Sequence, residues 1–133
     1  SGNLIFCLFD IEETPRTVGL SEFDGMITGA YSVFRCKDKT LAKFMEYFYI
    51  AMDEGKYLSF LYSGLRNTIS APRFLRIPTP IPSAEERKEI IRYLDLKTAG
   101  CDKATALIEK SIDSLQGFKS SLISNVVTGK VRV

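Results

Sequence analysis

The side chains that most often do chemistry in proteins are scarce in this sequence. Its 133 residues include no histidine, which excludes a Ser-His-Asp triad, a Cys-His dyad and an imidazole metal site. Cys7, Cys36 and Cys101 are scattered, odd in number and never in C-x-x-C spacing, so we expect neither a zinc site nor a disulfide framework. This use of cysteine suits a reducing compartment, and the predicted location is cytoplasmic. The residues predict no catalytic group, no metal and no cofactor.

Motifs for nucleotide and nuclease chemistry are also missing. The sequence contains neither G-x-x-x-x-G-K-[ST] nor G-x-G-x-x-G, so the usual phosphate-binding loop is absent. Glu86 with Lys88, and Asp95 with Lys97, have the acid-x-Lys spacing of a nuclease magnesium site. Both pairs fall inside a predicted helix, where such charges more often form solvated pairs with neighbours three or four residues away. We therefore expect a protein that is not an enzyme.

Binding chemistry is better represented, because basic residues gather in one stretch. Residues 56–82 contain Lys56, Arg66, Arg73 and Arg76 and no acidic residue, although the whole chain has a formal net charge of only +2. Four aromatic residues are interleaved with these bases, namely Tyr57, Phe60, Tyr62 and Phe74. Such a stretch could contact the phosphates and base edges of a nucleic acid. An ordinary solvated face is the alternative.

The elements that would position these residues predict an α+β fold. Residues 3–9 form a nearly unbroken apolar run that predicts a buried strand, and a loop with Pro15 and Gly19 follows it. Residues 29–36 alternate between two faces and predict a second strand. Residues 40–53 carry apolar side chains at helical spacing and predict an amphipathic helix packed on the core.

The segments after this helix are shorter. We expect the helix to begin after Thr40 as its N-cap and to end at Gly55. Residues 57–62 are ambiguous between a helical turn and a strand, and the sequence SGLRN of residues 63–67 predicts a loop. Residues 74–77 predict a brief strand.

A long helix has the clearest start signal in the sequence. Three alternating prolines in residues 78–82 predict an extended connector, and Ser83 with Glu86 forms an S-x-x-E capping box directly after it. No proline occurs from there to Val127, and Gly129 is suited to cap the end. The helix would have about 44 residues and span on the order of 65 Å.

This helix carries an apolar seam at heptad spacing. All of its d positions are apolar but only half of its a positions are, so we expect it to pack against another helix and not to form a free-standing zipper. The expected pairing residues are Ile91, Leu94, Cys101, Ile108, Ile112, Leu115, Leu122 and Val126. We predict a globular part in residues 1–82 and, in residues 83–133, a protruding spacer helix with a short tail. A helical hairpin broken near Gly100 is the alternative, and Gly117 is a second place for a kink.

The sequence predicts no membrane partner. No apolar run approaches the roughly 18–20 residues of a membrane span. No basic region precedes a short apolar core in the manner of a signal peptide.

Three segments of the C-terminal half form a recognisable pattern. They are PTPIP in residues 78–82, EERKEI in residues 85–90 and LISNVVTGKV in residues 122–131. This pattern resembles the specificity subunit of type I restriction-modification systems, in which a proline-rich exit leads into a characteristic helix that closes with V-T-G-K. The family's usual Glu-Gln at the helix start is Glu85-Glu86 here, which preserves the capping box.

The resemblance extends upstream and implies a partial target recognition domain. Residues 4–6, residues 29–31 and the 63–67 loop are similar to later parts of such a domain. The stretch that ends at Pro82 is shorter than a whole recognition domain, and a whole specificity subunit normally holds two domains and two helices. The resemblance therefore implies a C-terminal fragment or one half of a split subunit.

The resemblance also implies a function and its partners. The globular part would read one half of a bipartite site in double-stranded DNA. In the family, two such helices pair antiparallel, set the distance between the half-sites and bind the methyltransferase subunits, and the restriction subunit is engaged indirectly. Methylation and cleavage belong to those other subunits. A homodimer through the long helix is a further expectation that the sequence leaves open.

The DNA contacts that we expect lie in the basic stretch. Arg66 can bind guanine with two hydrogen bonds and Asn67 can do so with adenine, with Ser63 and Tyr62 beside them. The residues expected to contact phosphates are Arg73, Arg76 and Lys56. The alternative is that Asn67 stabilises a turn and that the arginines only solvate a face.

A protein of another class would explain the same elements. In a scaffold or oligomerisation module, the long helix would be the functional part and the globular part a cap. Salt separates the two hypotheses, because counterion release makes DNA binding fall steeply with salt, whereas pairing through an apolar seam should not.

Overall fold

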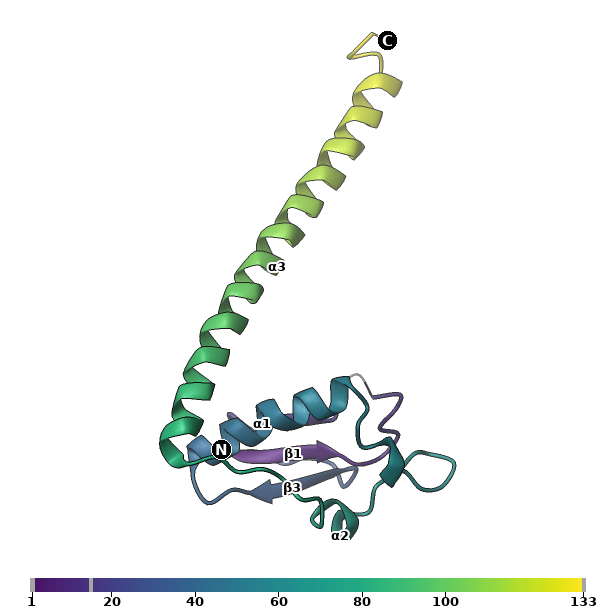
Figure 1. Cartoon of the computed structure of the whole chain (residues 1–133). Coiled ribbons are helices and arrows are strands. Elements are labelled where there is room, and N and C mark those ends of the chain that lie inside the picture. Colours follow the sequence, from purple (N-terminus) through teal and green to yellow (C-terminus); the bar gives the residue numbers. More distant parts are fainter. Residues whose placement is uncertain (1, 15, 133) are drawn as a thin grey trace. The chain divides into compact units, whose positions relative to one another are not determined.

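The computed structural model describes residues 2–14 and 16–132 and has an α+β fold, as the sequence predicts. The chain divides into two compact units, Ser1–Ile91 and Arg92–Val133 (Figure 1). The long helix begins at Ala84, and the compact units divide within it, after Ile91. Among the described residues, no helix combines the length and the apolar character that a membrane span needs.

The first unit is built on a three-stranded antiparallel sheet. Strands β1 (Asn3–Cys7), β2 (Val18–Leu20) and β3 (Tyr31–Arg35) are arranged in the order β2-β1-β3. The predicted first and second strands are confirmed as β1 and β3. Strand β2 was not predicted, because Gly19 was expected in a loop; it pairs with Ile5 in the sheet instead. Pro15, expected in the same loop, lies outside the described residues.

One face of the sheet carries the core. Leu4 and Phe6 of β1 are buried on this face, and Phe34 of β3 lies opposite Leu4. The Phe6 ring meets the ring of Tyr49 at a centroid distance of 5.0 Å and an interplanar angle of 90°, an edge-to-face contact. Tyr49 belongs to helix α1 (Lys39–Glu54), which covers this face (Figure 1).

The predicted C-terminal end of helix α1 is confirmed, whereas its predicted N-cap is wrong. Gly55 is the C-cap, as predicted. The N-cap is Asp38 and not Thr40, because the Asp38 carboxylate accepts a hydrogen bond of 2.6 Å from the backbone N–H of Leu41. Aspartate is at least as good an N-cap as threonine, and here it lies two residues earlier. Arg87 of the long helix approaches the same carboxylate at 3.7 Å.

Two short elements follow α1. The ambiguous stretch forms a single helical turn, η1 (Ser59–Leu61). The strand predicted for residues 74–77 is wrong, because a short helix, α2 (Ala71–Phe74), ends there. Ser70 precedes this helix and Pro72 lies in its first turn, where the missing proline N–H costs no helical hydrogen bond. Phe74 is buried and joins the aromatic core against Phe6 at a centroid distance of 4.7 Å.

The long helix α3 (Ala84–Val127) is continuous through Gly100 and Gly117, so the hairpin alternative is excluded and no break occurs at either glycine. At its start, the Ser83 hydroxyl accepts a hydrogen bond from the N–H of Glu86 at 3.2 Å, as the capping box predicts. At its end, Gly129 takes a φ of +73°.

The turn at Gly129 is a Schellman motif. The N–H of Gly129 bonds to the carbonyl of Val126 at 3.1 Å, and the N–H of Lys130 bonds to the carbonyl of Asn125 at 2.9 Å. These bonds satisfy carbonyl groups that the end of a helix otherwise leaves without partners. Of the described residues of α3, none is buried.

Candidate nucleic-acid interface

The predicted loop of the basic stretch is a closed hairpin, which we call the 63–68 hairpin. Ser63 and Thr68 form an isolated antiparallel bridge, with N–H to carbonyl distances of 3.0 and 3.1 Å in the two directions. The Ser63 hydroxyl adds a third bond to the Thr68 carbonyl at 2.9 Å. Gly64 and Asn67 take positive φ angles of 70° and 43°, which turns the chain tightly between them. Leu65 and Arg66 therefore occupy the outermost corners of the hairpin.

The hairpin is fixed to the segment that follows β1. The N–H of Asp10 bonds to the Arg66 carbonyl at 3.0 Å, and the N–H of Ile69 bonds to the Leu8 carbonyl at 3.0 Å. The Asn67 side-chain amide donates to the Glu12 carboxylate at 2.6 Å. Backbone and side-chain bonds together join residues that are more than 50 positions apart in sequence. The hairpin is thus held on the strand segment and is not a free loop.

Arg66 lies across this junction with its charge still accessible. Its guanidinium carbon is 4.9 Å from the centroid of the Phe9 ring, a cation–π distance, and its Nη1 is 3.9 Å from the Asp10 carboxylate. The side chain is 68% exposed, so the ion pair is weak and screened by solvent. Phe9 and Asp10 orient the guanidinium without covering it, which leaves it able to bind an external group.

Tyr62, which immediately precedes the 63–68 hairpin, differs from the hairpin residues. Its ring packs against the core, and its hydroxyl is buried without a hydrogen-bond partner among the described residues. Burial raises the pKa of this hydroxyl. The structure therefore places Tyr62 beneath the hairpin, where it supports the hairpin from the core side.

Lys56 is engaged inside the first unit. Its ammonium donates to the Asp53 carboxylate at 2.8 Å and to the Ile11 carbonyl at 3.1 Å. The second oxygen of Asp53, a buried residue, accepts the N–H of Thr17 at 2.8 Å. A phosphate contact by Lys56 would have to compete with both of its bonds.

Arg73 and Arg76 are the remaining basic residues of the stretch. Both are exposed, Arg73 in α2 and Arg76 in the turn after it. Within the described part of the chain, neither guanidinium takes part in a hydrogen bond or an ion pair. Their charges are available to an anionic partner, as the predicted phosphate contacts require.

The structure brings together Arg66, Asn67 and Ser63 of the predicted site in one hairpin. It adds three neighbours that sequence reasoning missed, namely Phe9, Asp10 and Glu12. No local pattern marks these three residues, because they reach the hairpin only through tertiary contacts.

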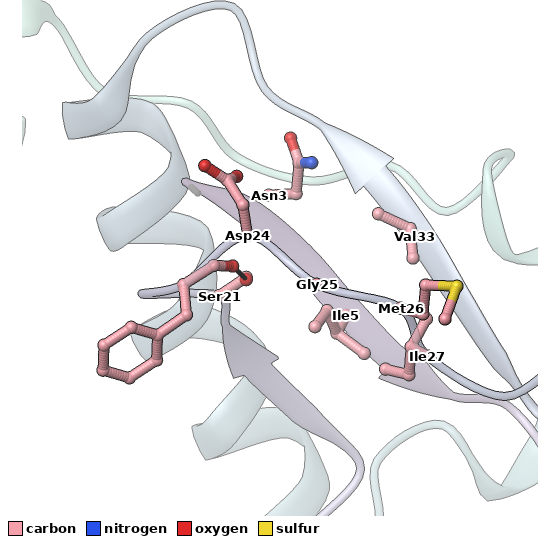
Figure 2. Close-up of a pocket in the computed structure, with 9 residues that line it drawn as sticks. Asn3, Ile5, Ser21, Asp24, Gly25, Met26, Ile27 and Val33 are labelled. Carbon is pink, nitrogen blue, oxygen red and sulfur yellow. Dashed lines mark hydrogen bonds between the residues drawn. The ribbon is translucent and has the colours of Figure 1, made fainter.

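A concave surface lies on the outer face of the sheet, and Figure 2 shows it between residues 21–27 and the strands. Its volume is about 230 Å³, and Ile5 and Val33 form its floor. Asp24 supplies the one ionisable side chain among its lining residues. No cluster of three or more His, Cys, Asp or Glu side chains suited to a metal occurs within residues 2–14 and 16–132.

The predicted pairing residues of α3 are accessible along the helix. Ile108 is 61% exposed, Leu115 67% and Leu122 48%, whereas Ile91, Leu94 and Val126 are half-buried. A row of exposed apolar side chains on one helix costs solvation free energy until a partner covers it. Pairing through this seam stays a prediction.

Comparison of the chain with protein-family models, with curated proteins and with solved structures finds no match.

Proposed function

We propose that this chain belongs to a DNA-recognition subunit similar to the specificity subunits of type I restriction-modification systems. In this proposal the first unit binds double-stranded DNA, and α3 is the docking helix for methyltransferase subunits in the cytoplasm. The restriction subunit is engaged through them, and the chain itself performs no catalysis.

Helix α3 is the observation that carries the proposal. The resemblance requires one uninterrupted helix between the proline-rich connector and the V-T-G-K sequence, and α3 runs from Ala84 to Val127 with a capping serine at its start and a Schellman motif at Gly129. Its exposed seam supplies an apolar surface for a second helix. A kinked or folded helix would not have supported a spacer role.

The charge distribution of the first unit supports binding to DNA. The segment from Lys56 to Pro82 has no carboxylate, and Arg66, Arg73 and Arg76 are all exposed on it. Arginine is suited to both phosphate and guanine because its guanidinium offers parallel N–H donors. A scaffold of the rival class needs the seam of α3 but has no need of this basic stretch.

Co-purification with the methyltransferase subunit encoded at the same locus tests the proposal. We expect a stable complex with the wild-type chain that is lost when the seam is charged by Ile108→Asp. Leu96→Asp is the matched control, because Leu96 is an exposed leucine of the same helix outside the seam residues. A folded wild-type chain that ignores the methyltransferase would favour the scaffold hypothesis.

Measurement of DNA binding at rising salt provides the second arm. Binding by the first unit should weaken steeply between about 50 and 200 mM salt, because phosphate contacts release counterions. Self-association that persists in high salt, with no DNA binding at low salt, would contradict the DNA-recognition proposal.

A further inference from the structure

The apex of the 63–68 hairpin carries an apolar side chain that no internal contact explains. Leu65 is 105% exposed, so its side chain is as open to solvent as in an extended peptide. Single exposed leucines are common and need no explanation by themselves. The surroundings of Leu65 are less common, because this leucine is held at the corner of a closed hairpin beside an exposed arginine.

The hairpin holds Leu65 in a fixed position. The bridge between Ser63 and Thr68 closes the hairpin below it, and the bond from Asp10 to the Arg66 carbonyl fixes the adjoining corner. In Figure 1 this loop extends from the body of the first unit. Because the backbone is already ordered, insertion of Leu65 into a partner would cost little additional conformational entropy.

The charge around Leu65 selects the kind of partner. Arg66 follows it directly and is 68% exposed, and each of the two acidic residues that contact the hairpin faces a hairpin side chain: Asp10 lies 3.9 Å from the Arg66 guanidinium, and Glu12 accepts a hydrogen bond from Asn67. Met26 is equally exposed, at 104%, but it has no adjacent cation, since no lysine or arginine occurs from Thr17 to Phe34. Of the two most exposed apolar side chains in the described chain, Leu65 is therefore the one placed to meet DNA.

We propose that Leu65 is a wedge that inserts between adjacent base pairs of DNA, while Arg66 binds beside it. This inference rests on the proposed DNA-binding function and deepens it. Proteins that bend DNA use leucine, among other apolar residues, to unstack one base step and kink the duplex. The kink would let a small unit touch more of the backbone, with Arg73 and Arg76 available for the phosphates.

A plasmid relaxation experiment tests the wedge without knowledge of the target sequence. The full chain is bound to closed circular plasmid, topoisomerase I relaxes the complex, and the linking number is measured after the protein is removed. Unstacking of base pairs under the bound protein should leave a change in linking number that grows with protein concentration. Binding of the same samples is followed by mobility shift.

Three variants make the experiment specific. We expect Leu65→Ser to retain a mobility shift, because its phosphate contacts are intact, but to lose the change in linking number. Leu65→Phe should still change the linking number of the plasmid, since phenylalanine also inserts between base pairs in proteins that bend DNA. Leu96→Ser, an exposed leucine of α3, should behave as the wild type. Circular dichroism confirms that each variant is folded.

The possible outcomes separate this inference from the function on which it rests. A wild-type chain that binds plasmid without changing its linking number, or a Leu65→Ser variant that changes it equally, overturns the wedge and leaves DNA binding standing. A folded wild-type chain that does not bind plasmid at low salt overturns both. If Leu65→Ser instead abolishes co-purification with the methyltransferase subunit, the leucine is a protein contact and the wedge is wrong.

Discussion

The side-chain amide of Asn67 donates a hydrogen bond of 2.6 Å to the carboxylate of Glu12, 55 positions earlier in the chain. Asn67 was predicted to bind adenine, and this bond uses one of the two N–H donors of the amide group that would donate a hydrogen bond to adenine N7. The neighbouring Arg66 has a similar acidic companion, Asp10, at 3.9 Å. In the proposed DNA-binding function, the carboxylates of Glu12 and Asp10 would therefore compete with a nucleic acid for these two side chains.

Removal of the Glu12 carboxylate should increase DNA affinity. Glu12→Ala frees the Asn67 amide and removes a negative charge beside the binding surface, and one hydrogen bond contributes about 1 kcal/mol, or roughly fivefold in affinity. Fluorescence anisotropy with a random duplex pool measures the change. Glu13→Ala is the matched control, since Glu13 is an exposed acid next in sequence. Equal affinity in the two variants would mean that Glu12 does not compete with DNA.

Substitution of Arg66 should weaken sequence-specific binding. If Arg66 binds a guanine, Arg66→Ala should cost about 1–3 kcal/mol and relax the preference at one base pair. Arg66→Lys keeps the charge but loses the paired N–H donors. Compared with Arg66→Ala, it should therefore recover more of the overall DNA affinity than of the preference for one base pair. Selection from a random duplex pool, followed by sequencing, measures both quantities.

Arg73 is expected to contact a phosphate, whereas Arg66 is expected to contact a base. Arg73→Ala should weaken binding to all sequences about equally and should reduce the salt slope of log K by about 1, as expected for a phosphate contact. A loss of preference at a single base pair would instead show that Arg73 reads sequence.

The Asp53 carboxylate should be important for the stability of the first unit. It joins the end of α1 to Thr17 and Lys56 through two bonds of 2.8 Å. Asp53→Ala leaves the Thr17 N–H without its partner in a buried place, and we expect a loss of about 2–3 kcal/mol in the free energy of unfolding. Urea denaturation of the wild type and the variant measures this difference in the free energy of unfolding. Glu54→Ala, at the exposed next position, should change the free energy little.

The N-cap of α1 should make stability depend on pH. Bonds from the Leu41 N–H and from Thr40, with a smaller effect of the Arg87 charge, hold the pKa of Asp38 below its ordinary value of 3.8. Because the folded state favours the ionised form, this stabilisation is fully present above pH 3.8 and is lost as the pH falls through the lower folded pKa.

Asp38→Asn isolates this effect from the other carboxylates. Asparagine is also a good N-cap but does not titrate. The stability difference between wild type and Asp38→Asn, measured by urea denaturation from pH 6 to pH 3, should therefore shrink at the acidic end. A difference that is constant with pH would contradict the assigned cause.

The elements that sequence predicted best are those with strong local signals. The capping serine at Ser83 and the glycine at Gly129 mark both ends of α3 through contacts within a few residues. Helix α1 was predicted for the same reason. Its N-cap was predicted wrongly, because Asp38 and Thr40 are both suitable residue types and the backbone geometry decides between them.

The missed elements depend on long-range contacts or on an overlooked signal. Strand β2 exists because Gly19 and its neighbours pair with β1, and three residues containing glycine have no strand pattern of their own. Helix α2 has a Ser70 and Pro72 start signal, but the apolar residues that follow it favoured a strand. At the candidate site, the sequence indicated Arg66 and Asn67 but gave no sign that Glu12 would meet them.

The central position of β1 has a consequence during synthesis. This strand leaves the ribosome before both of its sheet neighbours. The carbonyl of Leu8, just after the strand, accepts its hydrogen bond from the N–H of Ile69, which is synthesised much later. Until β2 and β3 have been synthesised, a nascent chain presents an apolar strand with two unpaired edges, a state that is prone to aggregation. The acidic residues Asp10, Glu12 and Glu13 follow this strand closely, and their mutual repulsion between copies would keep nascent chains apart.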